Sequence, residues 1–196
     1  MSKSLEFFFD FGSPTTYLAW TQLPKIAADA GIEITWRPML LGGVFKSTGN
    51  QSPVAIPAKA RYMLQDLARF ARRYGAPMVF NPHFPINTLT LMRGAAGYLD
   101  TPKFQTYVTA MFNAMWVEQK NLGKPEVIAE VLGEAGLDPA EFERLISDEG
   151  VKERLKGITE QAIKRGAFGA PTFFVGDEMH FGQDRLDFVA EALQRG

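Results

Sequence analysis

Apolar positions divide the chain into a strand-rich start, a long helical middle and a strand-rich end. Residues 5–9 (LEFFF) form a short, continuous apolar run, which is typical of a strand covered on both faces. Apolar residues then recur at spacings of three and four up to Gly31, which predicts a helix, and residues 32–36 (IEITW) alternate as a second strand. The first forty residues therefore predict a strand–helix–strand unit.

The middle of the chain has no strand signal between about Leu40 and Ala167. Residues 40–57 are rich in Gly, Ser and Pro, which predicts a loop. Helical patterns follow, with Thr101 and Asp138 as expected N-caps, each before a proline at the first helical position. The expected helices are residues 58–75, 87–99, 102–119, 125–136, 139–148 and roughly 149–166.

Two short strands return near the end of the chain. Residues 172–176 (TFFVG) and 178–181 (EMHF) meet at Gly176-Asp177, which signals a tight hairpin, and the last helix is expected to begin near Asp184 as its N-cap. This order predicts an α/β fold with a thioredoxin-like mixed sheet from residues 1–40 and 167–196. Residues 41–166 would be a large inserted helical domain, including a helix that returns to the sheet.

A thioredoxin-type fold has its active site where the first strand meets the first helix, beside a proline that precedes the third strand. Ser13 and Pro14 occupy the first place, and Pro171 occupies the second. The strand after Pro171 should run antiparallel to the first strand, so it would begin next to Ser13. From this layout we expect a cis Ala170–Pro171 bond, although only about one X–Pro bond in twenty is cis.

The amino-acid composition and net charge limit the partners and the kinds of reactive site that the chain can have. Of 196 residues, 46% are hydrophobic and 22% charged, and the net charge is −1, so we expect neither a nucleic acid nor a membrane as partner. The absence of cysteine excludes disulfides, thiolate metal sites and a Cys nucleophile. The N-terminal apolar run is too short for a signal peptide and no stretch approaches a membrane span, which predicts a cytoplasmic protein.

Metal and nucleotide sites are not indicated. His83 and His180 lack the spacing of a metal site, so no metal is expected. No G-x-G-x-x-G follows a strand, and no phosphate-binding P-loop is present.

Two interpretations of Ser13 follow from its position. A Ser before a Pro is a good N-cap, which contributes about 1 kcal/mol to a helix. The same hydroxyl lies at the tip of a strand, where it can face a ligand. As an activated nucleophile it would need a base such as His beside it, and no His is close in the sequence.

Four stretches carry a resemblance: FFFDFGSPTTYLAW, STGNQSP, IPAKARYMLQDL and FGAPTFFVGDEMHFGQDRL. Together they resemble the 2-hydroxychromene-2-carboxylate isomerases and kappa-class glutathione transferases over essentially the whole chain. The resemblance implies a DsbA-type thioredoxin fold, glutathione as cofactor, Ser13 as the catalytic group and a homodimer.

A hydrogen bond from Ser13 and the N-terminus of the following helix together supply enough free energy to ionise a bound thiol at neutral pH. A free thiol has a pKa of about 8.5, and lowering it to about 6.5–7 takes roughly 2–3 kcal/mol. A charge-assisted hydrogen bond supplies about 1.5–3 kcal/mol and a helix N-terminus about 0.3–1 kcal/mol. Ser13 is therefore expected to stabilise a thiolate.

The resemblance also implies the residues that hold glutathione. Lys59 would bind the glycine carboxylate, the backbone of Ala170 would pair with the cysteinyl part, and Gln183 and Asp184 would hold the γ-glutamyl end. The expected glutathione-binding set is Ser13, Asn50, Lys59, Ala170, Pro171, Phe181, Gly182, Gln183 and Asp184.

The substrate pocket is expected around Asn87. An aromatic carboxylate would need a cation, for which Arg93, Lys46 and Arg61 are unranked candidates. The first functional hypothesis is a glutathione-dependent isomerase, in which reversible thiolate addition allows cis–trans isomerisation of 2-hydroxychromene-2-carboxylate or a related unsaturated aromatic acid. The alternatives are a kappa-like glutathione S-transferase and a redox-inert thioredoxin-fold binding module.

Overall fold

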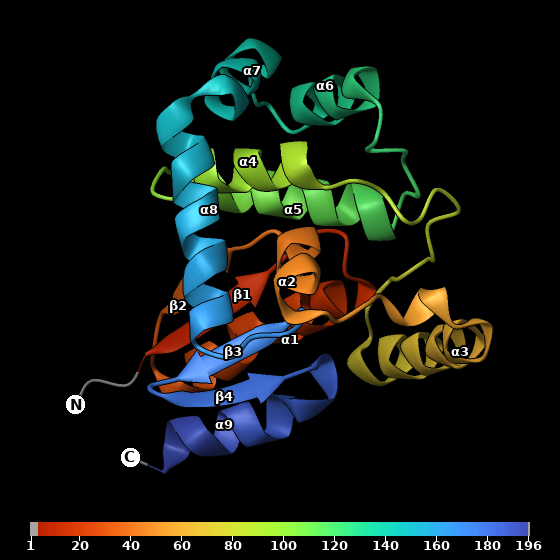
Figure 1. Ribbon diagram of the computed structural model, residues 1–196, viewed down its shortest axis with the longest axis vertical. Helices are drawn as coiled ribbons and strands as arrows, with labels where there is room; N and C mark the ends of the chain where they lie inside the picture. Colours follow the sequence, from red (N-terminus) through yellow and green to blue (C-terminus); the bar gives the residue numbers. More distant parts are fainter. Residues whose placement is uncertain (1–3, 196) are drawn as a thin grey trace.

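The computed structural model describes residues 4–195. A mixed sheet of four strands runs in the order β2-β1-β3-β4 (Figure 1). β1 pairs in parallel with β2, while β3 is antiparallel to both β1 and β4. The strands are β1 (Leu5–Phe9), β2 (Ile34–Pro38), β3 (Thr172–Val175) and β4 (Glu178–Phe181). The expected strand–helix–strand unit, the hairpin and the antiparallel placement of the third strand are confirmed.

Helix α1 (Pro14–Ala30) connects β1 to β2, and helices α2 to α8 with their loops lie between β2 and β3 (Figure 1). In Figure 1, α4 to α7 gather beyond one end of the sheet, α3 lies at one side, and α8 runs back across the sheet. The remaining helices are α2 (Leu41–Thr48), α3 (Pro57–Tyr74), α4 (Leu89–Tyr98), α5 (Phe104–Trp116), α6 (Pro125–Glu134), α7 (Pro139–Ser147), α8 (Glu149–Lys164) and α9 (Leu186–Gln194), with short 3₁₀ turns η1 (Pro53–Ala55) and η2 (Gln183–Arg185).

The predicted loop over residues 40–57 is wrong in its first half, where α2 lies. Its two glycines disfavour a helix, but tertiary contacts offset this. The Leu41 N–H donates to the Asp10 carboxylate, the Leu40 N–H donates to the Thr159 hydroxyl, and Val44 is fully buried. Long-range hydrogen bonds therefore determine where this helix begins.

Two predicted N-caps are also wrong, whereas the Asp138 cap of α7 is confirmed. The Thr101 hydroxyl accepts from Lys103 N in a turn before α5, which begins only at Phe104. Asp184 lies within η2, and α9 begins two residues later.

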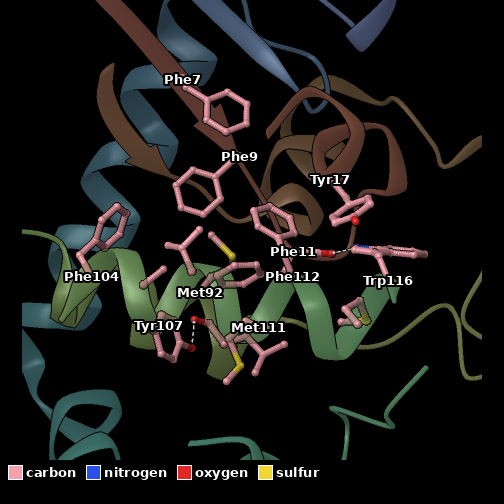
Figure 2. Close-up of a cluster of buried hydrophobic side chains, with 14 of the residues drawn as sticks. Phe7, Phe9, Phe11, Tyr17, Met92, Phe104, Tyr107, Met111, Phe112 and Trp116 are labelled. Atoms are coloured by element: carbon pink, nitrogen blue, oxygen red, sulfur yellow. Dashed lines mark hydrogen bonds between the residues drawn. The ribbon is translucent and has the colours of Figure 1, made fainter. Parts of the chain in front are cut away.

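The sheet is buried on both faces, as the apolar run predicted. Phe7 and Phe9 belong to the larger hydrophobic core, whereas Phe8 belongs to a second cluster. Figure 2 shows the larger core, in which aromatic side chains of β1 pack against those of α5. There the Trp116 indole N–H donates to the Phe11 carbonyl at 2.8 Å, which links α5 to the end of β1.

This core joins the sheet to the helices encoded between its strands. Leu5 and Phe173 from the sheet share it with Leu132 and Phe142 from α6 and α7. The division into residues 1–40 with 167–196 and residues 41–166 stays a prediction about domains. Within residues 4–195, no helix has both the length and the apolar character needed to cross a membrane.

Candidate functional site

Ser13 begins α1 as predicted. Its backbone is extended, its side-chain Oγ accepts from Thr16 N at 3.1 Å, and Pro14 takes the first helical position. The residue is only 4% exposed. Because Pro14 has no N–H, the first N–H of the helix is that of Thr15, and it has no acceptor among the described residues. The start of α1 therefore presents one hydroxyl and one free N–H at the same place.

Ala170 lies against this helix start. The Ser13 hydroxyl donates to the Ala170 carbonyl oxygen at 3.1 Å, and the Thr15 hydroxyl donates to the same oxygen at 3.2 Å. The Ala170–Pro171 bond is cis, as the layout predicted. The Ala170 N–H has no acceptor among residues 4–195, so it is available to a ligand with an extended backbone.

A cavity of about 790 Å³ opens beside Ser13, a size typical of small-molecule sites. It is bordered by the α1 start, by α2, by α3 with the segment before it, and by the segments flanking the β3–β4 hairpin. Eight of the nine residues predicted to hold glutathione line it: Ser13, Asn50, Lys59, Ala170, Phe181, Gly182, Gln183 and Asp184. Pro171, the ninth, is buried and is not part of the lining.

Asn50 and Lys59 differ in whether their polar side-chain groups already have partners within the chain. The Asn50 amide is used within the chain, because its Nδ2 donates to the Phe168 carbonyl at 2.8 Å and its Oδ1 accepts from Gln51 N. Lys59 is exposed on the first turn of α3 and forms no ion pair with any described residue. Lys59 is therefore available to bind an anion, while Asn50 fixes the cavity wall.

The segment after β4 forms the opposite wall. Gly182 has a φ of 97°, a left-handed conformation that favours glycine, and its N–H donates to the Pro171 carbonyl. The backbone N–H groups of Gln183 and Asp184 have no acceptor in the described part of the chain. The Asp184 carboxylate lies 2.6 Å from an Arg185 guanidinium nitrogen.

Asp10 holds together the segments around this site through hydrogen bonds, a role that was not predicted from the sequence. Its carboxylate is fully buried and accepts from Gly12 N, Leu41 N and the Thr88 hydroxyl at 2.7–2.9 Å. Burial raises the pKa of Asp10, while these three hydrogen bonds act in the opposite direction. A carboxylate directly after an apolar strand, three residues before Ser13, was the signal that could have identified it.

Apolar side chains complete the cavity and were also missed. Leu41 and Phe45 come from α2, Ile56 and Met63 from the start of α3, and Phe84 from the loop before α4. Sequence periodicity could not place Leu41 and Phe45, since α2 was predicted as loop, and Ile56 and Phe84 lie outside the predicted helices. They give the cavity a face suited to an aromatic ligand.

The three expected substrate residues are not brought to this cavity. Arg93 lines a separate groove between α4 and α8, and Asn87 lines a third, smaller cavity, with its Oδ1 accepting from Leu89 N. Lys46 is exposed on α2, whose neighbouring residue Phe45 faces the Ser13 cavity. Among the residues that line the Ser13 cavity, Lys59 is the one cation.

The geometry suits a peptide-like thiol. The Ser13 hydroxyl and the α1 N-terminus can stabilise a thiolate, and Ala170 N–H can pair with a peptide backbone. No group of three or more metal-ligating side chains occurs within residues 4–195. The fold and site together define a thioredoxin-type protein with hydroxyls in place of redox cysteines.

Comparison with known proteins gives the family. Residues 4–194 match the DSBA-like thioredoxin domain. A 2-hydroxychromene-2-carboxylate isomerase of Pseudomonas putida is 36% identical over 97% of this chain and 94% of its own. Glutathione S-transferase kappa 1 of Rattus norvegicus is 30% identical over 97% and 91%. A solved structure of a 2-hydroxychromene-2-carboxylate isomerase matches with a TM-score of 0.86 at 35% identity, covering 97% and 94% of the two chains.

The chain thus belongs to the DSBA-like thioredoxin family, and within it to the group of 2-hydroxychromene-2-carboxylate isomerases and kappa glutathione transferases. The predicted fold class and family are confirmed.

Proposed function

We propose that this protein is a glutathione-dependent isomerase of 2-hydroxychromene-2-carboxylate or a related unsaturated aromatic acid. The observation that carries the proposal is a buried serine hydroxyl at the start of α1, facing a cavity, in a chain without any cysteine. Such a hydroxyl has no redox role, but it suits a thiolate from a bound ligand. The isomerases at 33–36% identity support the substrate class.

The residues at the site fit glutathione. The Ala170 N–H lacks an acceptor and Lys59 lacks an ionic partner among the described residues, so both have unused capacity for a peptide with a free carboxylate. When bound, glutathione would supply a thiol whose anion adds reversibly to a conjugated carbon, which permits rotation about the former double bond. The residues of the chain bind this thiol and keep it ionised.

Each residue has a defined part in this proposal. Ser13 Oγ donates to the sulfur, and the α1 N-terminus adds a favourable dipole. Lys59 binds the glycine carboxylate. Gln183 and Asp184 hold the γ-glutamyl end, with backbone N–H groups for its carboxylate and the Asp184 carboxylate for its ammonium.

The acid substrate would lie against the apolar wall of the cavity. Leu41, Phe45 and Phe84 provide surfaces for an aromatic ring. Asn87, Arg93 and Lys46 remain candidates for its polar groups, although Arg93 and Asn87 line other cavities. A reducing, glutathione-rich compartment fits such an enzyme, so a cytoplasmic location is part of the proposal. A homodimer also remains a proposal.

A kappa-like transferase is the second candidate, supported by the 30% identity to the rat kappa enzyme. It would use the same thiolate site but would release a conjugate. The two outcomes differ in the fate of the thiol.

The test uses purified protein, 2-hydroxychromene-2-carboxylate and a tenth of an equivalent of glutathione. An isomerase brings all the substrate to equilibrium with its isomer, over many turnovers per glutathione, and leaves all the free thiol. A transferase stops when the thiol is consumed. Reactions without glutathione, and with Ser13→Ala, are the controls. If glutathione does not bind and no substrate is converted, the protein is instead a binding module in which Ser13 is only a cap.

A further inference from the structure

Two hydroxyls share one carbonyl oxygen at the Ser13 site. Ser13 Oγ lies 3.1 Å and Thr15 Oγ1 lies 3.2 Å from the Ala170 oxygen. The two hydroxyl oxygens are themselves 3.0 Å apart. No backbone N–H in the described part of the chain donates to this oxygen. The carbonyl of Ala170 therefore depends on these two side chains.

This arrangement creates a competition for the Ser13 proton. Ser13 has one hydroxyl hydrogen, which is directed at Ala170 O, while its oxygen accepts from Thr16 N. A thiolate beside Ser13 needs that same hydrogen. Ala170 is only 8% exposed, so its carbonyl would lose a hydrogen bond that water cannot readily replace. Leaving a buried acceptor unsatisfied is unfavourable.

We propose that Thr15 is a positioning residue that keeps the Ala170 carbonyl hydrogen-bonded, so that Ser13 can direct its hydrogen to the thiolate. The inference rests on the proposed thiolate function of Ser13. No covalent bond changes in this switch, since each hydroxyl keeps its proton and only the acceptor of the Ser13 hydroxyl changes. Thr15 thus acts through Ser13 and does not contact the sulfur.

Thr16 provides a matched control on the same helix turn. Its hydroxyl is buried, has no hydrogen-bond partner within residues 4–195 and does not line the cavity. Removing it by Thr16→Val changes one hydroxyl to a methyl, as Thr15→Val does. The two variants differ in the contact to Ala170.

The experiment measures the thiol pKa of bound glutathione from the ultraviolet absorbance of the thiolate, over a range of pH. For Thr15→Val we expect a pKa about 0.5–1 unit higher than in wild type, which is a roughly 3- to 10-fold smaller ratio of thiolate to thiol at a given pH, because one net hydrogen bond has a free energy of that order. Thr15→Ser should restore the wild-type value. Thr16→Val should leave it unchanged.

The double variant separates an indirect from a direct role. If Thr15 acts through Ser13, the Ser13→Ala/Thr15→Val protein has the same thiol pKa as Ser13→Ala. A higher pKa in the double variant would mean that Thr15 donates to the sulfur itself, and would overturn the inference. So would a wild-type pKa in Thr15→Val.

Failure of the proposed function has a different signature. In that case wild-type protein either does not bind glutathione or binds it with an ordinary thiol pKa, and both proposals are wrong. A lowered pKa in wild type that Thr15→Val does not change overturns the role of Thr15 alone.

Discussion

The hydroxyl of Ser13 lies 3.1 Å from the carbonyl oxygen of Ala170, although 157 residues separate them in the chain. The sheet brings them together, because β3 runs antiparallel to β1 and begins where β1 ends, with Phe8 paired to Thr172. The site is therefore a product of strand order.

Replacing Asp10 by Asn should destabilise the protein. The Asn side chain can keep two of the three hydrogen bonds of Asp10, but its NH₂ group would then face an N–H donor, most directly that of Leu41. We expect a loss of about 1–3 kcal/mol in the free energy of unfolding, measured by urea denaturation.

The pH dependence of this loss has a definite sign. Burial raises the pKa of Asp10 above 3.8 in the folded protein, so its contribution to stability is full below that value and declines as pH rises through the folded pKa. The difference between wild type and Asp10→Asn should thus be larger at about pH 4 than at pH 7. A larger difference at pH 7 would refute this reasoning. Thr88→Val, which removes one donor but keeps the acid, is the control and should lose less stability.

Glu6 should behave in the opposite way. Its carboxylate binds Arg37 at 2.7 Å and Arg165 at 2.6 Å. Burial alone would raise the pKa of Glu6, but the two guanidinium groups together lower it below 4.5. Its stabilising effect is therefore present above that pH and lost as pH falls through the folded pKa.

Glu6→Gln should cost about 1–3 kcal/mol of unfolding free energy at pH 7 and progressively less below pH 4.5. Glu153 offers a matched control, since its pair with Lys156 is exposed on both sides. Glu153→Gln should have no measurable effect. Equal losses from Glu6→Gln and Glu153→Gln would show that the Glu6 network is not a special support of the sheet.

Lys59→Gln should weaken glutathione binding. An exposed cation facing a carboxylate contributes about 0.5–1 kcal/mol, so the dissociation constant should rise roughly 2- to 5-fold at low salt. The difference should shrink at high salt, because ions screen an exposed pair. Calorimetry provides the measurement. Arg61→Gln removes a cation two positions along α3 that does not line the cavity, and it should leave the constant unchanged.

The sequence predicted the parts of the site that depend on the order of elements. Ser13 at the strand–helix turn and Pro171 before a strand followed from the layout, because an antiparallel third strand must begin near the end of the first. The Ser13 cap also followed from local rules, since its side chain needs only an N–H three residues away.

The rest depends on contacts between distant segments. Helix α2 contains two glycines in its first three residues, and nothing local indicates that Asp10 and Thr159 hold its first turn. Phe45 consequently could not be placed on a cavity wall. Asn87 and Arg93 are close to the cavity-lining Phe84 in sequence, yet Asn87, just before α4, and Arg93, on α4, line other cavities.

The central claim is that Ser13 stabilises the thiolate of bound glutathione, and its most direct measurement is the thiol pKa of glutathione bound to wild type and to Ser13→Ala. Asp138→Ala controls for the loss of a helix cap, because Asp138 caps α7 outside the cavity and its removal should cost a similar ~1 kcal/mol of stability. We expect a pKa about 1.5–2 units below the free value of about 8.5 in wild type and Asp138→Ala, and a return toward about 8.5 in Ser13→Ala. A Ser13→Ala protein that binds glutathione with the wild-type thiol pKa would contradict the account.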